Sequence, residues 1–414
     1  MDNKKNIPEI RFPEFKNEGE WEKKKLSQVG NLVNGLTYSP NDVSSAGVLV
    51  LRSSNIKKNK LSLEDNVYVN LKINEANLSK IGDILICVRN GSKSLIGKNA
   101  LIKETLPKTT HGAFMTVFRS DNYGFISQLF QSDLFFQQVH ADLGATINSI
   151  NGKNLLNYQF DLPTNPKEQQ KIADCLLSLD EVIEAQEEKL KALQLHKKGL
   201  MQNLFPQEGE TVPKYRFPEF QNDGDWVEKE LSEVGRLVNG LIYSPDDIND
   251  KGTLVLRSSN IKNSRLVFID NVYVSMMINS DNLTKIGDIL ICIRNGSKSL
   301  IGKNALVKEN LTETTHGAFM TIFRSQNYNF VYQLFQSDSY FKQVHADLGA
   351  TINSINGKNL LKYKFYFPTN IAEQQKIATG LSCLDDLITE QQNEIDRLKL
   401  HKKGLMQVLF PQTN

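Results

Sequence analysis

The chain has 414 residues, of which 40% are hydrophobic and 23% are charged, and its formal net charge is +2. This composition is typical of a globular protein of two or three domains and argues against long disordered, collagen-like or membrane-spanning architectures. The longest apolar runs, such as residues 287–293, are strand-sized and much shorter than the roughly 18 residues that cross a bilayer. A net charge this small neither requires nor excludes nucleic acid as a partner, so local clusters must decide that point.

The N-terminal residues are polar and contain no apolar core that could act as a secretory signal, which predicts a cytoplasmic protein that is not bound to a membrane. The four cysteines form no Cys-x-x-Cys pair and are widely spaced: Cys87, Cys175, Cys292 and Cys383. We therefore expect buried, reduced thiols rather than a disulfide framework or a structural zinc site.

The chain is one module written twice. The sequence Arg-Phe-Pro-Glu-Phe at residues 11–15 recurs at residues 216–220, and this offset of 205 (216 − 11) holds to the end of the chain. Residues 80–100 are nearly unchanged at 285–305, and all six histidines fall into pairs: His111 with His316, His140 with His345, and His196 with His401. A period this long indicates duplicated domains rather than a solenoid.

The first part of each module predicts an α+β domain. Short, β-branched apolar stretches at residues 48–51, 67–69, 84–88 and 114–118 alternate with turns rich in Asn, Gly, Ser and Asp, which is typical of strands. One amphipathic helix is predicted over residues 123–143.

The second part of each module predicts a long helix. Apolar residues recur at alternating spacings of four and three, which predicts a coiled coil. An amphipathic helix that packs on a globular sheet is the alternative. Polar residues interrupt this seam at matching places and could fix the register: Gln186 and Lys197 in the first module, Gln391 and Lys402 in the second. At ~1.5 Å per residue the first helix would be roughly 55 to 60 Å long.

Two such helices in one chain are most simply paired with each other. If they run antiparallel, the two globular domains are related by a pseudo-twofold axis, which is also the symmetry of a DNA duplex with an inverted-repeat sequence. The predicted fold class is therefore α+β, with two similar α/β domains separated by a long antiparallel two-helix coiled coil.

Several motifs resemble those of a known family. Residues 144–155 (Gly-Ala-Thr-Ile-Asn-Ser-Ile-Asn-Gly-Lys-Asn-Leu), then 160–163 and Glu-Gln-Gln-Lys-Ile-Ala at 168–173, are similar to the junction between a target-recognition domain and a conserved helix in the specificity subunits of type I restriction-modification systems. Related sequences recur in the second module, at 349–360 and 373–378. The opening Pro-Glu-Ile-Arg-Phe-Pro and the sequence Gly82-Asp83-Ile84-Leu85 also resemble this family, so the resemblance covers essentially the whole chain.

The resemblance implies a division into target-recognition domains at 1–165 and 207–370 and conserved spacer helices at 166–206 and 371–414. Such subunits bind double-stranded DNA, one half of a split target on each domain. They dock two methyltransferase subunits and, through them, restriction subunits. No cofactor is expected in this chain, whereas the partners would use S-adenosylmethionine, ATP and magnesium for adenine methylation and ATP-dependent cleavage. Many relatives carry two different recognition domains, and the near-identity of the two here predicts two similar half-sites in inverted orientation.

No catalytic constellation competes with this interpretation. Residues 91–98 are faintly similar to a phosphate-binding loop, but Asn99 follows the lysine where Ser or Thr should bind magnesium. The sequence shows neither a methyl-donor loop nor a tetrapeptide for a flipped adenine, and the histidines lack metal-ligand spacing. The remaining alternatives are a self-sufficient nuclease or methyltransferase and a coiled-coil scaffold that binds only protein.

Polar clusters in loops are the candidate DNA contacts, because guanidinium groups and amides can read guanine and adenine edges, and lysines and glycine turns can meet phosphates. The alternative is that the arginines pair with acidic neighbours and the serines form turns. Thr146, Asn148 and Ser149 are equally suited to helix capping. The first cluster and its repeat are Arg52, Ser53, Ser54, Asn55 and Lys57, with Arg257, Ser258, Ser259, Asn260 and Lys262. The second cluster and its repeat are Arg89, Asn90, Ser92, Lys93 and Lys98, with Arg294, Asn295, Ser297, Lys298 and Lys303.

Overall fold

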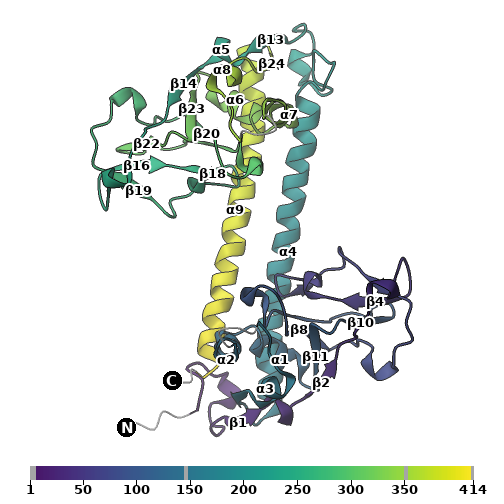
Figure 1. Ribbon diagram of the computed structural model, residues 1–414. Coiled ribbons are helices and arrows are strands. Elements are labelled where there is room, and N and C mark those ends of the chain that lie inside the picture. The colour runs from purple at the N-terminus through teal and green to yellow at the C-terminus, as the bar shows by residue number, and fades with distance from the viewer. Residues whose placement is uncertain (1–5, 144–147, 349–352, 412–414) are drawn as a thin grey trace. The chain divides into compact units, whose positions relative to one another are not determined.

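The computed structural model describes residues 6–143, 148–348 and 353–411 (Figure 1). The chain forms two compact units, one made of Met1–Glu187 with Asn393–Asn414 and the other of Glu188–Gln392. Each unit therefore combines one globular module with parts of both long helices. The expected division into four functional segments is a different partition and stays a prediction.

In the first unit, two four-stranded sheets build the globular part. One has the strand order β2-β11-β8-β9 with antiparallel neighbours, and the other has the order β10-β4-β7-β3, in which β10 and β4 are parallel. Two smaller sheets are the antiparallel pairs β1-β12 and β5-β6. The strands are β1 Glu22–Lys25, β2 Asn31–Asn34, β3 Val43–Ser44, β4 Val48–Leu51, β5 Ile56–Lys57, β6 Lys60–Leu61, β7 Tyr68–Val69, β8 Ile84–Cys87, β9 Asn99–Leu101, β10 Thr109–His111, β11 Met115–Arg119 and β12 Gln159–Leu162.

The four predicted strands are confirmed, whereas the helix predicted over residues 123–143 is wrong as a single element. Two helices, α1 Tyr123–Leu129 and α2 Asp133–Asp142, take its place. The chain breaks between them because Ser132 stands before the new helix with an extended backbone and donates its hydroxyl to the Leu129 carbonyl at 2.6 Å. A short helix, α3 Gly152–Asn157, follows, and its first turn is capped by the Asn151 side chain.

The second unit repeats this architecture with the corresponding sheets β14-β23-β20-β21, β15-β19-β16-β22, β13-β24 and β17-β18. Its strands are β13 Val227–Glu230, β14 Arg236–Asn239, β15 Ile248–Asn249, β16 Thr253–Leu256, β17 Ile261–Lys262, β18 Arg265–Leu266, β19 Val272–Val274, β20 Ile289–Cys292, β21 Asn304–Leu306, β22 Thr314–His316, β23 Met320–Arg324 and β24 Lys364–Phe367. Its short helices are α5 Leu231–Val234, α6 Tyr328–Leu334, α7 Asp338–Asp347 and α8 Gly357–Leu360.

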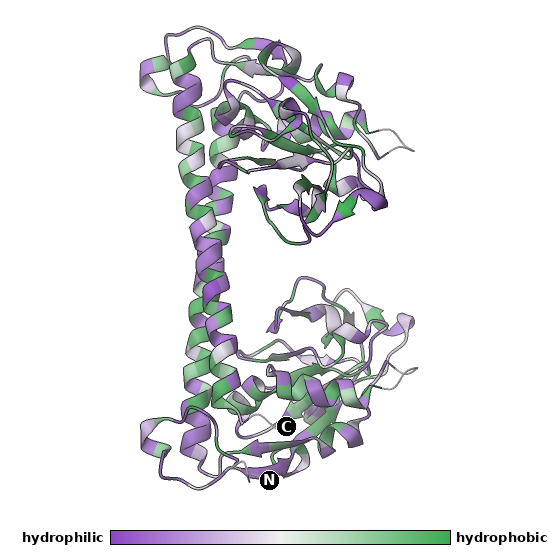
Figure 2. Ribbon diagram, turned by 90° about the vertical axis from the view of Figure 1, so that its left-hand side faces the viewer, coloured by the Kyte–Doolittle hydropathy of each residue, from purple (hydrophilic) through white to green (hydrophobic). Residues whose placement is uncertain are grey.

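The two long helices are α4 Pro166–Leu204 and α9 Ile371–Leu409, each of 39 residues. Hydrophobic and hydrophilic residues alternate along both (Figure 2). The N-terminal turns of α4 pack into the core of the first unit through Ile172, Ala173 and Leu176. This core includes sheet residues, so these turns pack on a globular sheet, as the alternative describes. The same core also contains Leu409, at the end of α9, and Phe410, which follows it. In the second unit the core likewise contains residues from the start of α9 and from the end of α4, so each core is packed by both long helices.

Ion pairs show how the helices are paired within each unit. In the first unit, Lys402 Nζ lies 2.6 Å from Asp180 Oδ1, and Lys399 Nζ lies 2.5 Å from Glu187 Oε1. Position along α4 rises as position along α9 falls, so the two segments are antiparallel. The lysine that interrupts the heptad pattern is buried and neutralised across the helix pair, and Lys197 with Asp385 repeats this contact at 2.6 Å in the second unit. A continuous coiled coil along both helices stays a prediction.

A buried three-residue contact explains why the opening motif and the Glu-Gln-Gln motif occur together in each module. Arg11 donates two hydrogen bonds to the Glu168 carboxylate, at 2.6 and 2.7 Å, and Trp21 Nε1 donates a third at 3.3 Å. Arg216, Trp226 and Glu373 form the same contact in the second unit. A bidentate arginine satisfies a carboxylate that burial would otherwise destabilise, so this contact fixes the first turn of each long helix to its domain.

The cysteine expectation is partly wrong. Cys87 and Cys292 are buried and free, but Cys383 is free and exposed on α9, and Cys175 is partly exposed. Among the described residues, none of the helices combines the length and apolar character needed to span a membrane.

Candidate nucleic-acid interface

The structure brings the two predicted polar clusters of each module together. The first cluster follows β4 and the second follows β8, and Asn90 Nδ2 donates to Ser53 Oγ at 3.1 Å. In the second module Asn295 Nδ2 donates to Ser258 Oγ at 3.0 Å. Two loops that are 37 residues apart in the chain therefore form one polar surface in each unit.

A third loop that the sequence reasoning missed completes this surface. Phe114, in the turn between β10 and β11, accepts hydrogen bonds at its carbonyl from the backbone amides of Val88 and Arg89, both at 3.1 Å. Its side chain is 59% exposed, and the guanidinium carbon of Arg89 lies 5.6 Å from its ring centroid. Phe319 and Arg294 repeat this geometry at 5.6 Å. The signal in the sequence was the unchanged His-Gly-Ala-Phe at 111–114 and 316–319, which ends in an apolar residue beside turn residues.

We name the surface made by residues 52–54, 89–94 and 112–114 the reading surface of the first module, and its repeat at 257–259, 294–299 and 317–319 that of the second. Arg89 and Arg294 are exposed on it, and an arginine held over an aromatic face retains free N–H groups along its edge. The exposed serines Ser92 and Ser297 lie in the same loops, each with its backbone N–H bonded to the preceding asparagine side chain at 3.0 Å.

Asn55 and Asn260 do not suit the base contact predicted for them. Both are fully buried. Asn55 Oδ1 accepts from the Arg52 amide at 2.9 Å, and its Nδ2 donates to the Ser62 carbonyl at 3.0 Å. Asn260 makes the same contacts with Arg257 and Val267. Because these amides already bond within their own loop, their role is structural.

Arg52 and Arg257 show the pairing with acids that was the alternative. Arg52 Nη2 lies 2.9 Å from Asp65 Oδ2, and Arg257 Nη2 lies 2.8 Å from Asp270 Oδ2. The carboxylate occupies donor groups at one end of each guanidinium, which argues against the guanine contact predicted for these two arginines. The neighbouring Ser54 hydroxyl is buried, whereas Ser259 is exposed.

The predicted lysines occupy different environments. Lys57 and its equivalent Lys262 are both exposed. Lys57 Nζ lies 2.5 Å from Glu64 Oε2. Lys93 and Lys298 are exposed in the turns after Ser92 and Ser297. Lys98 is half-buried, and Lys303 donates to the Ser258 carbonyl at 3.2 Å, so it fastens the two loops together. Burial lowers the pKa of Lys303.

Asn148 supports the second loop, because its Nδ2 donates to the Gly91 carbonyl at 3.0 Å, and Ser149 forms a backbone bridge with Arg89. This is a structural role for both residues. Thr146 lies outside the described residues.

The histidines beneath the reading surface are structural. His111 and His316 end β10 and β22, are buried, and hydrogen-bond through Nε2 to the carbonyls of Val33 and Val238 at 2.9 and 3.0 Å. Burial lowers the pKa of both imidazoles, that of His316 to about 4, so they are neutral at pH 7. Within the described residues, no group of three or more His, Cys, Asp or Glu side chains is placed to hold a metal ion.

The fold and this surface together define a duplicated, two-part recognition protein, and comparison with known proteins gives its family. The model of the type I restriction modification DNA specificity domain matches residues 18–195 and again 223–399. The chain therefore belongs to this family and is a specificity subunit of a type I restriction-modification system. Such a subunit is the non-catalytic component that determines which DNA sequence the system recognises. The resemblance drawn from its motifs is confirmed.

Relatives cover most of the chain. It is 25% identical to the putative type I restriction enzyme MjaX specificity subunit of Methanocaldococcus jannaschii, over 94% of this chain and 93% of that protein. It is 29% identical to the type I restriction enzyme EcoKI specificity subunit of Escherichia coli, over 69% of this chain and 63% of that protein.

Two solved structures are similar in fold. The S subunit of a type I restriction-modification system from M. genitalium covers 99% of this chain and is itself fully covered, with a TM-score of 0.65 and 16% identity. A chain from a study of complex assembly and conformational transition of the type I system has a TM-score of 0.51 and 16% identity, and the match covers 93% of this chain and 96% of that one. The predicted fold class of two similar mixed domains is confirmed.

Proposed function

We propose that this specificity subunit reads a split DNA target whose two halves are the same, or nearly the same, sequence in inverted orientation. The observation that carries this proposal is the equality of the two reading surfaces. Residues 89–94 and 294–299 have one sequence, Arg-Asn-Gly-Ser-Lys-Ser. Their contacts to the neighbouring loops agree within 0.1 Å, at 3.1 and 3.0 Å for the asparagine–serine bond and 5.6 Å for both arginine–phenylalanine pairs.

The inverted orientation is supported by the exchange of helix ends. Lys402 contacts Asp180, and Lys197 contacts Asp385, which are equivalent pairs because 402 − 197 and 385 − 180 both equal 205. Each module therefore receives the end of the other module's helix in the same way. An inverted repeat in duplex DNA has a twofold axis, and the proposal is that the two modules meet its two halves in that way.

Within each reading surface, Arg89 and Arg294 are the proposed base-reading residues, since a guanidinium can donate two hydrogen bonds to the O6 and N7 atoms of guanine. Ser92 with Lys93, and Ser297 with Lys298, are proposed to contact phosphates through hydroxyl and ammonium groups and through the backbone at Gly91 and Gly296. An added Cβ would meet only open space at both glycines, so the backbone there is accessible.

The proposed assembly contains two methyltransferase subunits and, through them, restriction subunits, in the cytoplasm. The partners supply S-adenosylmethionine chemistry and ATP hydrolysis, and this chain supplies only sequence recognition. The relative whose structure belongs to a study of complex assembly supports association with other subunits.

Single-molecule methylome sequencing of cells with and without this chain tests the proposal. We expect one methylated motif to disappear with the chain, and that motif to consist of two matching, inverted halves around an unread spacer. Two unrelated half-sites would contradict the proposal that the two surfaces read the same sequence. No change in the methylome would instead contradict a role in DNA modification.

A further inference from the structure

Each reading surface is attached to a hairpin that reaches toward the long helices. In the first module the β5-β6 hairpin directly follows the loop at 52–55. The Ser62 amide donates to the Asn55 carbonyl at 2.8 Å, and the Asn55 side chain donates back to the Ser62 carbonyl at 3.0 Å. Val267 and Asn260 make the same two bonds in the β17-β18 hairpin, at 2.8 and 3.0 Å. A displaced hairpin would therefore displace the loop that carries Ser53 or Ser258.

The turn of each hairpin has an unfavourable backbone. Lys58 and Asn59 have φ angles of 50° and 60°, and Asn263 and Ser264 have φ angles of 51° and 59°. This left-handed region favours glycine and tolerates asparagine, so the unfavourable positions are Lys58 in the first turn and Ser264 in the second. Each hairpin therefore depends on contacts outside the turn to hold its position.

In the second module a buried tyrosine provides such a contact. Tyr332, on α6, is 5% exposed, and its hydroxyl donates to the Ser264 carbonyl at 2.8 Å. The Ser264 hydroxyl donates in turn to Gln336 Oε1 at 2.7 Å. A hydrogen bond beneath a packed aromatic ring is shielded from dissolved ions.

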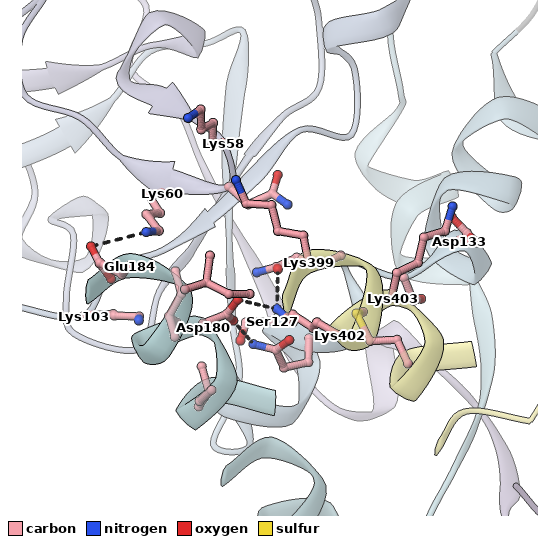
Figure 3. Close-up of a pocket in the computed structure, with 18 of the residues that line it drawn as sticks. Lys58, Lys60, Lys103, Ser127, Asp133, Asp180, Glu184, Lys399, Lys402 and Lys403 are labelled. Carbon is pink, nitrogen blue, oxygen red and sulfur yellow. Dashed lines mark hydrogen bonds and ion pairs between the residues drawn. The ribbon is translucent and has the colours of Figure 1, made fainter. Parts of the chain in front are cut away.

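In the first module this ring is absent, because residue 127 (332 − 205) is serine. A cavity of about 800 Å³ lies where the first hairpin faces α1, α4 and the end of α9 (Figure 3). Its lining includes Asn59, Lys60, Ser127 and Asp180, which correspond to Ser264, Arg265, Tyr332 and Asp385. The cavity thus includes the space that the Tyr332 side chain fills in the second module.

Ion pairs hold the first hairpin across this cavity. Lys60 Nζ lies 3.5 Å from Glu184 and 3.7 Å from Glu187, and Lys58 Nζ lies 3.7 Å from Glu187, which also accepts from Lys399 (Figure 3 shows the Lys60–Glu184 pair). These side chains are partly exposed to water, so salt screens their attraction. In the second module Thr389 and Gln392 stand in place of the two glutamates, and Asn263 stands in place of Lys58. The acidic residues and one of the two lysines are therefore replaced by uncharged residues.

We propose that Tyr332 is a positioning residue for the second reading surface, and that the first reading surface is held instead by the Lys58, Lys60, Glu184 and Glu187 ion pairs. The two modules then read similar half-sites with unequal tolerance of salt, because one hairpin is anchored by a buried ring and the other by screened charges. This inference rests on the proposed DNA reading by both modules.

Hydrogen–deuterium exchange of the full chain at 50 and 500 mM KCl tests the anchoring without DNA. We expect exchange in residues 56–62 to accelerate about three- to fivefold with salt, since screening removes two or three weak pairs, while residues 261–267 change little. Ser127→Tyr should abolish the salt response of the first hairpin. Tyr332→Phe, which keeps the ring, should accelerate exchange of the second hairpin about two- to tenfold through loss of one hydrogen bond. Equal salt responses in the two wild-type hairpins would overturn the inference.

A second measurement links the anchors to DNA reading. In the assembled methyltransferase complex, Arg294→Ala leaves recognition to the first module and Arg89→Ala leaves it to the second. The affinity for a duplex that carries the target sequence should fall more steeply with salt for Arg294→Ala than for Arg89→Ala. Adding Ser127→Tyr to Arg294→Ala should remove this difference in slope. If the two variants show equal salt slopes of DNA affinity while the two hairpins differ in hydrogen exchange, only the link between hairpin position and DNA reading is overturned. Loss of all sequence preference in the wild-type complex would overturn the proposed function itself.

Discussion

The contact between Arg89 and Phe114 bears on the base contact proposed for Arg89. The phenylalanine is too exposed to contribute much to the core, and its main contacts are the guanidinium at 5.6 Å and the backbone bonds that hold the loop after β8. An exposed cation–π contact restricts the arginine side chain before DNA arrives, so less conformational freedom is lost on binding.

Arg89→Ala and Arg294→Ala should each lower the affinity of the assembled complex for its target about ten- to hundredfold, because a bidentate base contact contributes ~1–3 kcal/mol. Phe114→Ala should cost about two- to fivefold through loss of the cation–π contact. Binding to a fluorescent duplex at fixed salt measures both effects. Ile81→Ala is the matched control, since Ile81 is 53% exposed and lies outside the reading surface. If the arginine variants fail to assemble, these residues are structural.

His316 should make stability depend on pH. Its folded pKa of about 4 lies below the usual value of ~6.5, so between these values the unfolded chain takes up a proton that the folded chain excludes. The contribution of His316 to the free energy of unfolding is then fully present above pH ~6.5 and is lost as the pH falls toward 4. Between pH 7 and 5 the loss from this residue is about 2 kcal/mol.

Urea unfolding of the second unit, followed by hydrogen exchange in β22 and β23, measures this dependence. His316→Gln should flatten the pH profile between 7 and 5, while His401→Gln, which changes an exposed histidine on α9, should leave it unchanged. An unchanged profile in His316→Gln would show that this imidazole is accessible to protons in the folded chain.

At the scale of elements, the heptad pattern predicted both long helices because a repeat of seven persists over many turns and no proline lies inside either helix after its first residue. The role of the lysine interruptions was visible only in the structure. Lys402 and Asp180 are 222 residues apart, and no spacing within either helix indicates which acid the lysine meets. Burial lowers the pKa of Lys402, and the charge of Asp180 opposes that shift.

Lys402→Met should destabilise the first unit by about 1–3 kcal/mol, less than the 3–5 kcal/mol of a fully buried pair because the Asp180 side chain is 22% exposed. The double variant Lys402→Met with Asp180→Leu should recover most of this loss, since no charge is left unpaired. Chemical denaturation followed at Trp21 measures both variants, and Lys197→Met provides the matched change in the second unit. A double variant as unstable as the single one would show that the ion pair is a net source of stability.

The sequence predicted the strands and the polar clusters but not the break between α1 and α2 or the third loop. Residues 123–143 keep a helical apolar pattern through the break, and the first helix ends in local bonds that this pattern does not reveal, including those from the Ser132 amide and hydroxyl to the Leu129 carbonyl. Asn55 was misassigned because a buried loop-closing amide and a base-reading amide are the same residue type in a polar segment. Phe114 was missed because an apolar residue after a strand is more often part of a core.

For the whole molecule, the duplication of one module has the strongest consequence for the expected DNA target. The two modules share their reading residues, their buried arginine–glutamate–tryptophan contact and their lysine–aspartate pair, and they differ mainly in the hairpin anchors and in exposed residues such as Ile242 and Met277. If the proposed surfaces alone read the bases, we expect differences outside them to change stability and salt response without changing the target.

A chain in which residues 22–162 are replaced by residues 227–367 should therefore direct its methyltransferase partners to the same target as the original chain. The replaced segment begins at β1 and ends at β12, and its substitute begins at β13 and ends at β24, so the helices and the arginine–glutamate contact are kept. Both reading surfaces are then those of the second module, and methylome sequencing reports the result. A motif with one altered half would show that residues outside the shared loops contribute to base reading. In that case two differing positions beside the reading loops, Val88 against Ile293 and Thr37 against Ile242, would be the first to exchange.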